Sequence, residues 1–275
     1  MKLIVTLSGK SERFTESGYP EKQLVRVLGK SVLEHVVEMY TSICPLRDMY
    51  FILKDGDIET HKLLTDIYGR VNIRHVEPHS RGPCYSVLQC DFDWMEDEEI
   101  IVSYCDIRVE WDAQKFISFC HHADVDGAVI THSGFHPHRL YNKSFAFIKN
   151  DMHGNILGIQ EKIPYTDNIF NEHASSGIYY FKRYADMKHY FQLTMDKHDD
   201  FNGEYYVTIP YNHMIRDGKN VKLYEVNNFF SFGTPRDIEL LKAWETIVRK
   251  SSVETKEDLQ LSFSYWNHFL AAHDE

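Results

Sequence analysis

The amino-terminal stretch most strongly constrains how this 275-residue chain can fold. It begins with a short apolar run at residues 3–7, which is rich in β-branched side chains and stops at Ser8-Gly9. Such a run is typical of a strand that is buried on both faces. A polar loop follows, and from Ser31 onward apolar residues recur at helical spacing, with Ser31 and Glu34 placed as a capping box. The chain is therefore predicted to open with a strand, a loop and a helix.

Apolar runs and helix-like segments continue to alternate along the chain. The further predicted strands are at residues 49–53, 71–76, 99–106, 127–131, 144–149, 156–160, 175–181 and 221–226, and the predicted helices include 58–68 and 238–250. A Gly-containing turn between 144–149 and 156–160 indicates a hairpin. Elsewhere the alternation predicts parallel strands joined by crossovers, which is an α/β fold.

The loop after the first strand carries the residues of a phosphate site. Gly9, Arg13 and Lys22 all lie in it. In this layout backbone N–H groups, two fixed cations and a helix N-terminus can converge on phosphate. We therefore predict a nucleoside triphosphate (NTP) site. The alternative is an ordinary strand and loop with both cations solvated, because short glycine motifs also arise by chance.

The order of the motifs resembles the nucleotidylyltransferases that join an NTP to a phosphorylated sugar or small alcohol. Their signature is roughly L-A-G-x-G-x-R-F, then P-K-x-L, then G-K-P-x-x-E, and the matching residues are Leu7, Gly9, Arg13, Phe14, Lys22, Leu24, Gly29, Lys30 and Glu34. The resemblance implies a three-layer α/β/α domain at residues 1–240, with a mixed, mostly parallel, Rossmann-like sheet of the nucleotide-diphospho-sugar transferase type. A C-terminal helical extension at residues 241–275 is expected to pack on that domain.

The resemblance also implies roles for the residues of the loop and of the turn at Gly82. The implied nucleotide-binding residues are Leu7, Ser8, Gly9, Arg13, Lys22 and Gly82. Arg13 and Lys22 are the implied catalytic groups, the first neutralising the leaving pyrophosphate and the second bridging the α-phosphate and the acceptor phosphate. Two residues depart from the pattern. Ser11 replaces the second loop glycine, which costs energy if φ is positive there, and Glu12 adds negative charge near the polyphosphate.

Two positions bear on a metal site. Asp106 ends the apolar run 99–106, and an acidic side chain at the carboxyl end of a central parallel strand lies where α/β sheets place ligands. It matches the metal-binding aspartate of the resembled family, which implies Mg²⁺ as cofactor, an ion that prefers oxygen ligands. The alternative is a residue that only caps the strand. Ser231 stands where many members have a second metal aspartate, and it brings no charge. Asp237 is predicted to cap the following helix.

The acceptor side is implied by three later residues. Glu161 and Lys162 match a Glu-Lys pair that lines the acceptor pocket, with Glu161 accepting from hydroxyls and Lys162 neutralising the acceptor phosphate. Gly177 matches a strand glycine that lets substrate approach the backbone. The structural alternative is an exposed charge pair beside an edge strand.

The resemblance favours one reaction and leaves others open. It implies transfer of a nucleotidyl group to a phosphorylated sugar or small metabolite, with pyrophosphate released. The motif forms resemble members from bacterial capsule and surface-polysaccharide clusters, which favours CTP. One alternative is a non-catalytic subunit of the same fold that binds nucleotide-sugar and regulates a partner. Another is a glycosyltransferase, although Cys105-Asp106-Ile107 lacks the Asp-x-Asp metal motif of that class.

Composition sets the remaining expectations. The formal net charge of −11 argues against a general grip on nucleic acid. The apolar runs are short and the amino terminus lacks a signal-peptide pattern, so we expect a cytoplasmic protein without membrane spans. The five cysteines show no CxxC pair and are expected to be reduced, mostly buried thiols. The apolar segment at 257–272 is expected to pack on the domain or to form a homodimer contact.

A histidine-rich loop at residues 132–138 has two interpretations. His136 and His138 raise the possibility of zinc, but their spacing, with no cysteine or acidic third ligand nearby, is a weak zinc pattern. We expect solvated loop histidines.

Overall fold

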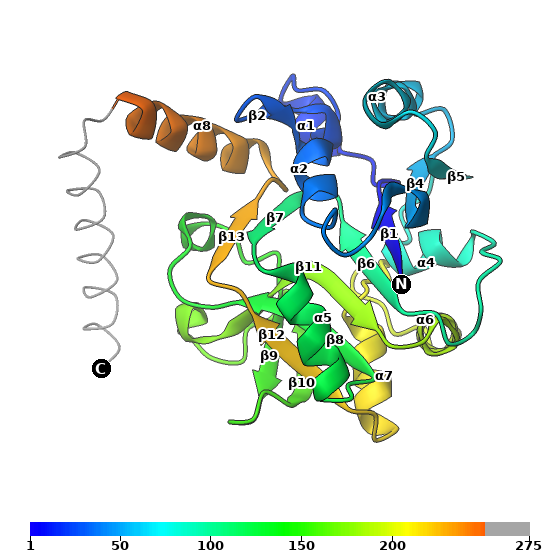
Figure 1. Cartoon of the computed structure of the whole chain (residues 1–275). Helices are drawn as coiled ribbons and strands as arrows, with labels where there is room; N and C mark the ends of the chain where they lie inside the picture. The colour runs from blue at the N-terminus through cyan, green and yellow to red at the C-terminus, as the bar shows by residue number, and fades with distance from the viewer. Residues whose placement is uncertain (251–275) are drawn as a thin grey trace.

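A computed structural model describes residues 1–250 of the chain and the side chains of residues 1–246. Its centre is a nine-stranded sheet with a main path in the order β10-β9-β11-β6-β1-β4-β5, while β8 pairs with β11 and β12 pairs with β8 (Figure 1). The strands are β1 (Lys2–Thr6), β4 (Met49–Lys54), β5 (Asn72–Val76), β6 (Ile100–Tyr104), β8 (Gly127–His132), β9 (Ala146–Asn150), β10 (Ile156–Glu161), β11 (His173–Phe181) and β12 (Val221–Glu225).

The direction of the strands confirms the predicted mixed, mostly parallel sheet. β6, β1, β4 and β5 are parallel neighbours, as are β8 and β12. Only β10 and β11 run against the others within this sheet. The predicted hairpin is the antiparallel pair of β9 and β10. Because the parallel strands end at one edge, the loops that follow β1 and β6 lie side by side there.

Helices cover both faces of the sheet, which confirms the three-layer architecture. One face packs on α2 (Val32–Glu38), α3 (Ile58–Tyr68) and α5 (Ala113–His122). The other face packs on α4 (Pro83–Leu88), α6 (Tyr184–Asp196) and α7 (Ile209–Arg216). Alternate residues of β1 show why both faces need cover: Leu3 and Val5 join the first core cluster and Ile4 joins the second.

Short elements shape the carboxyl edge of the sheet. They are α1 (Glu12–Glu16), β2 (Arg26–Val27), β3 (Lys30–Ser31), β7 (Ile107–Glu110), β13 (Asn228–Ser231), and the 3₁₀ turns η1 (Lys22–Leu24), η2 (Leu46–Asp48), η3 (Pro137–Leu140) and η4 (Ile169–Asn171). The predicted capping box at the start of α2 is present, with Ser31 Oγ accepting from the N–H of Glu34. β7 directly follows Asp106 and pairs with β13, so that Ile107 faces Ser231. This pairing joins segments that are far apart in the sequence.

The last described element is α8 (Pro235–Lys250), which extends away from the sheet (Figure 1). It begins three residues before the predicted start. Its Ile238 and Leu241 pack with Phe14 and Phe232 in a small separate cluster. The predicted packing or dimer contact of residues 257–272 lies outside the described residues.

The expectation of solvated histidines at 132–138 is wrong. His132, His136 and His138 are 0%, 7% and 4% exposed. The ring of His132 stacks on Phe229 with centroids 4.1 Å apart. Burial lowers the pKa of all three, that of His138 to about 3, so neutral imidazole rings pack here like aromatic side chains. In the described part of the chain, no group of three or more His, Cys, Asp or Glu is arranged to hold a metal ion.

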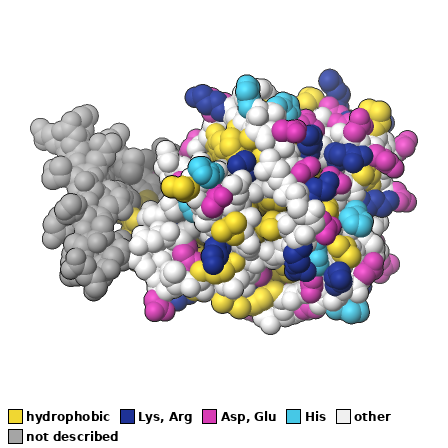
Figure 2. Space-filling view, turned by 90° about the horizontal axis from the view of Figure 1, so that it is seen from below, with side chains coloured by type: hydrophobic (Ala, Val, Ile, Leu, Met, Phe, Trp, Pro, Cys, Tyr) yellow, Lys and Arg dark blue, Asp and Glu magenta, His cyan; other side chains and the backbone are white. Residues whose placement is uncertain are grey.

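The described surface carries both signs of charge. Figure 2 shows basic and acidic side chains interspersed with small apolar areas on one face. Among residues 1–250, no helix has the length and apolar character needed to cross a membrane. Four of the cysteines are buried and all five are free, as expected for reduced thiols.

Candidate active site

A cavity of about 610 Å³ opens at the carboxyl edge of the sheet. It gathers the loop after β1, the turn before α4, the end of β6, and parts of β10, β11 and β13. The predicted site residues in its wall are Ser8, Gly9, Arg13, Lys22, Gly82, Asp106, Glu161, Lys162, Gly177 and Ser231. Residues from separate stretches of the sequence therefore line one cavity.

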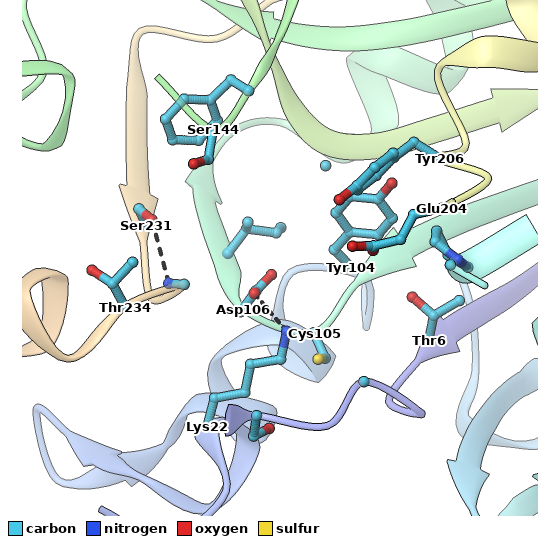
Figure 3. A pocket seen from close by; sticks show the side chains of 18 of the residues that line it. Thr6, Lys22, Tyr104, Cys105, Asp106, Ser144, Glu204, Tyr206, Ser231 and Thr234 are labelled. Carbon is cyan, nitrogen blue, oxygen red and sulfur yellow. Dashed lines mark hydrogen bonds and ion pairs between the residues drawn. The ribbon is translucent and has the colours of Figure 1, made fainter. Parts of the chain in front are cut away.

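An ion pair lies in the middle of this cavity. Lys22 Nζ is 2.7 Å from Asp106 Oδ2, and the two side chains are 22% and 16% exposed. Burial, the largest single cause, lowers the pKa of Lys22, but the charge and hydrogen bond of Asp106 together with Cys105 raise it, and the net pKa lies above its ordinary value. In Figure 3, Lys22 reaches from the loop side directly toward Asp106. Lys22 is thus a fixed cation beside the strand end.

A second carboxylate lies near Asp106, and sequence reasoning assigned it another role. Asp237 is 2% exposed and accepts hydrogen bonds from Ser231 Oγ at 2.9 Å and Tyr141 Oη at 2.6 Å. A Cβ placed on Gly233 would lie 3.5 Å from Asp106 Oδ2, 3.6 Å from Ser231 Oγ and 3.9 Å from Asp237 Oδ2. Both carboxylates therefore flank the same small glycine.

The prediction that Asp237 caps α8 is wrong. The capping side chain is Thr234, whose Oγ accepts from the N–H of Asp237 at 3.2 Å. Both carboxylate oxygens of Asp237 are instead engaged by Ser231 and Tyr141. An aspartate in the first turn of a helix is so often a cap or a dipole partner that the sequence pattern favoured that role.

The opposite end of the cavity combines charge with aromatic rings. Thr208 Oγ donates to Glu161 at 2.6 Å. Burial raises the pKa of Glu161 to about 6, although the Thr208 bond and Lys162 act against the rise. Lys162 donates to the hydroxyl of Tyr206, and its Nζ lies 4.3 Å from the centre of that ring. Lys162 has a φ of 58°, in the left-handed region that non-glycine residues seldom adopt.

Sequence reasoning missed Glu204, Tyr104 and Tyr206, which also line this end. They lie together on one side of Asp106 in Figure 3, opposite Ser231 and Thr234. Tyr104 belongs to the predicted strand at 99–106, where nothing marks a side chain that faces a cavity, and Glu204 and Tyr206 lie between the predicted strands at 175–181 and 221–226. Gly177 sits in the irregular part of β11 with a φ of 76°, and a Cβ there would lie 3.2 Å from Tyr104. Its missing side chain thus makes room for Tyr104.

The third part of the wall is a chain of hydroxyl and imidazole groups near α4. Ser8 Oγ is 2.6 Å from Ser86 Oγ, which is 3.0 Å from His79 Nε2. Burial lowers the pKa of His79, so this imidazole favours its neutral form. Ser86 and His79 are further residues that the sequence did not mark as site residues.

Residues 3–156 match the MobA-like NTP transferase domain family. The match spans more than half of the chain. The chain belongs to this family. Its predicted class, a nucleotidyltransferase, is confirmed by the same match. No curated protein matches it in sequence.

Solved structures share the fold of this NTP transferase. The nucleoside-diphosphate-sugar pyrophosphorylase from Vibrio cholerae RC9 is 19% identical with a TM-score of 0.67, over 87% of this chain and 98% of that one. The inositol-1-phosphate CTP transferase from T. maritima is 15% identical with a TM-score of 0.63, over 91% and 97%. A CMP:2-keto-3-deoxy-manno-octonic acid synthetase complexed with CTP is 16% identical with a TM-score of 0.63, over 89% and 98%. At these identities the likeness establishes the fold alone.

One predicted nucleotide-binding residue of the transferase lies outside the cavity wall. Leu7 is 1% exposed, and its side chain belongs to the core cluster under α2. Its N–H donates to the carbonyl of Ile52 at 2.8 Å. An apolar side chain that ends a buried strand stays in the core, so Leu7 supports the loop from below.

The donor set of the transferase suits a hard cation with few protein ligands. Asp106 offers a carboxylate in the cavity, and Ser231 Oγ, whose proton is donated to Asp237 and which accepts from the N–H of Gly233 at 3.3 Å, keeps one lone pair as an acceptor. Mg²⁺ is commonly held by one or two carboxylates together with substrate phosphates and water. The residues present therefore fit the implied ion.

Proposed function

We propose that the chain transfers the cytidylyl group of CTP to the phosphate of a phosphorylated sugar or small metabolite, with release of pyrophosphate. The observation that carries the proposal is the Lys22–Asp106 pair, which lies between the phosphate-type loop and the Glu161–Lys162 end of one cavity. CTP is favoured by the motif forms of the chain and agrees with two structural neighbours named for CTP or complexed with it. A role in capsule or surface-polysaccharide biosynthesis stays a prediction from the motifs.

The reaction needs the protein mainly to align the two phosphates and to neutralise the charge on their oxygens. An oxygen of the acceptor phosphate attacks the α-phosphorus, a new P–O bond forms, and the bond to pyrophosphate breaks. No general base is needed, because a phosphate dianion is already a nucleophile near neutral pH. The rate then depends on alignment and on neutralising charge over the phosphate oxygens.

Each cation of the cavity has a place in this scheme. Arg13 neutralises the leaving pyrophosphate from the loop side. Lys22 holds the α-phosphate and the incoming phosphate together, for which it must leave Asp106. Lys162 neutralises the acceptor phosphate, beside which Glu161 accepts hydrogen bonds from the rest of the acceptor.

Asp106, supported by Ser231 and Asp237, would hold Mg²⁺ in this site. When bound, the ion screens the negative charge of the triphosphate. The Asp106 carboxylate would face the ion in place of the ammonium group of Lys22, which would leave Lys22 available to the substrate phosphates. Ser231 would offer an acceptor at this site, because its own proton is donated to Asp237.

The test is pyrophosphate release with Mg²⁺, each of the four NTPs, and a panel of sugar 1-phosphates, phosphocholine and amino-acid phosphates. We expect release with CTP and one acceptor, and a loss of at least about a hundred-fold in Lys22→Ala and Asp106→Asn, as for other electrostatic groups at reacting phosphates. A matched control is Lys54→Ala. Lys54 pairs with Glu21 at 2.6 Å with similar exposure, 20% and 23%, but lies outside the cavity wall.

Other outcomes select the alternatives. Release with an NTP other than CTP overturns the base assignment. Tight nucleotide binding without turnover on any acceptor favours the non-catalytic regulatory subunit. Transfer of a sugar from a nucleotide-sugar to a hydroxyl favours a glycosyltransferase.

A further inference from the structure

Gln23 follows Lys22 directly in η1, but its side chain lies in a different place. Lys22 reaches into the cavity, whereas Gln23 is 0% exposed and lies outside the cavity wall. The amide nitrogen of Gln23 donates to Thr60 Oγ at 2.9 Å and to Asp57 Oδ2 at 3.2 Å. Both acceptors lie at the start of α3. The turn that carries Lys22 is therefore bound to a helix that contributes no described residue to the cavity wall.

The two acceptors at α3 are themselves held in place. Asp57 is 5% exposed and caps α3, with its Oδ1 accepting from the N–H of Thr60 at 3.0 Å. Thr60 is 0% exposed. One carboxylate oxygen of Asp57 thus holds the helix start, and the other accepts from Gln23. The amide of Gln23 is bound to a fixed partner.

The turn at Lys22 gains little rigidity from its own backbone. η1 is a single 3₁₀ turn, in which the N–H of Leu24 donates to the Glu21 carbonyl at 2.9 Å and the N–H of Val25 donates to the Lys22 carbonyl at 3.3 Å. Hydrogen bonds in 3₁₀ turns have poorer geometry than those of α-helices. Side-chain bonds to other elements therefore matter for the place of this turn.

The amide of Gln23 is kept at a cost. Its oxygen Oε1 is buried and has no hydrogen-bond partner in the part of the chain that the structure describes. Three acceptors, the third being Glu21 Oε2 at 2.9 Å, surround its two N–H groups. Buried polar groups are nearly always paired, so each exception needs an explanation. Local rules of this kind are broken most often where function requires it.

We propose that Gln23 is a positioning residue for Lys22. By binding Asp57 and Thr60, it fixes the turn from which the Lys22 side chain reaches Asp106 and, when substrates bind, their phosphates. This rests on the proposed function, which gives Lys22 its role. Only the side chain of Lys22 then has to move from the carboxylate to the phosphates, while its backbone stays in place.

The test is a double-mutant cycle of Gln23→Met and Lys22→Ala. Methionine keeps the length of the side chain and removes the amide. Because small misplacements of a group at the reacting atoms lower the rate strongly, Gln23→Met should lower kcat by about ten-fold or more. In the Lys22→Ala chain the same substitution should have no further effect, since the group that Gln23 positions is gone. The dissociation constant for the triphosphate should stay within about two-fold, because the loss concerns the transition state.

Thr60→Val provides a second variant, in case Gln23→Met does not fold. It removes one acceptor of Gln23 with little change in size, and it should lower kcat in the same direction, again only when Lys22 is present. Lys54→Ala should leave kcat unchanged. Its partner Glu21 stays bonded to Gln23 through the other carboxylate oxygen, so the turn keeps its anchor.

Thr194→Val is the control for a loss of stability alone. Thr194 is 0% exposed like Thr60, lies in α6 outside the cavity wall, and donates to the Tyr190 carbonyl at 2.8 Å. Its loss should lower Tm by about 2–4 °C, as for one buried hydrogen bond. It should leave kcat unchanged with or without Lys22.

The measurements are pyrophosphate release at saturating substrates, calorimetric titration with the magnesium salt of the NTP, and thermal unfolding of each variant. A fall in kcat in Gln23→Met and Thr60→Val that disappears in the Lys22→Ala chain supports the inference. An unchanged kcat in both variants, or the same fold-decrease with and without Lys22, overturns it and leaves the proposed function standing. Full turnover in Lys22→Ala, or no release by the wild type, overturns both.

Discussion

Burial and hydrogen bonding act in opposite directions on Glu161. Burial raises its pKa to about 6, while Thr208 and Lys162 stabilise the charged form. A glutamate in an unfolded chain has a pKa of about 4.3. At pH values between about 4.3 and about 6, the folded state binds more protons than the unfolded state. The free energy of unfolding therefore falls as the pH rises from the lower to the higher of these two values. Above pH 6 the full cost of an ionised, buried carboxylate is present.

Glu161→Gln should therefore stabilise the protein at pH 8 and not at pH 4.5. Glutamine can still accept from Thr208 but carries no charge. The gain at pH 8 should be at most about 2 kcal/mol, because one pKa unit corresponds to about 1.4 kcal/mol. Thermal unfolding of both proteins at the two pH values measures it. Parallel pH profiles of wild type and variant would contradict the raised pKa. The variant should also raise the KM for the acceptor, because the acceptor loses an anionic hydrogen-bond partner.

Asp106 and Asp237 show how far the roles of single residues can be predicted from a sequence. Asp106 was recognised because it ends an apolar run, and a strand end fixes where a side chain lies. Asp237 was predicted to be a helix cap from its local position alone. Its actual partners, Tyr141 and Ser231, come from other segments of the chain, so the sequence pattern could not show them. The histidines of residues 132–138 were misjudged for the same reason: the ring that buries His132 is Phe229, far along the chain.

Local elements were predicted well because their signals are local. α3 has the predicted bounds, and the capping box of α2 is present. The pairing of β7 with β13 had no such signal, because each strand has four residues and the two are distant in sequence. β11 was seen as a run, but its irregular register, which lets it pair with β6, β8 and β9, depends on the strands around it. Pairing partners are set by tertiary packing, which a single sequence does not display.

The backbone just before α4 packs closely against the segment around Tyr205. Gly82 precedes α4 with a φ of 81°, and a Cβ there would lie 2.7 Å from the Tyr205 backbone nitrogen. The two segments are also joined by backbone bonds, Tyr205 N–H to the Arg81 carbonyl at 2.9 Å and Cys84 N–H to the Tyr205 carbonyl at 3.1 Å. Gly82→Ala must push these segments apart.

We expect Gly82→Ala to cost about 3 kcal/mol or more, the sum of a strained backbone and overpacking. Gly203→Ala is the matched control. Gly203 has a φ of 82° but no atom within 4 Å of the added Cβ, so only the backbone cost of about 1 kcal/mol applies. Urea unfolding of the two variants gives the difference. Equal losses of unfolding free energy in the two variants would mean that the segment around Tyr205 moves away from Gly82 at little cost.

At the scale of the whole molecule, the cavity and its supports occupy the chain up to α8. The last residue of the cavity wall is Thr234. Beyond it, Asp237 supports Ser231, and Ile238 and Leu241 complete the small core around Phe14. The first turns of α8 thus support the cavity. We therefore propose a division of the carboxyl-terminal part of the chain within α8, and the predicted boundary at residue 240 stays a prediction.

Two shortened chains test this division. A chain that ends after Lys250 keeps every described residue of the cavity wall and of the Phe14 cluster, so its pyrophosphate release should stay within about two-fold of the full chain. A chain that ends after Thr234 loses Asp237 and the fully buried Ile238, and it should lose activity and unfold more readily. Size-exclusion chromatography of the first chain beside the full-length protein shows whether residues 251–275 bring two copies together. If the chain ending at Lys250 is inactive and the full chain active, those last residues complete the site, by themselves or through a second copy.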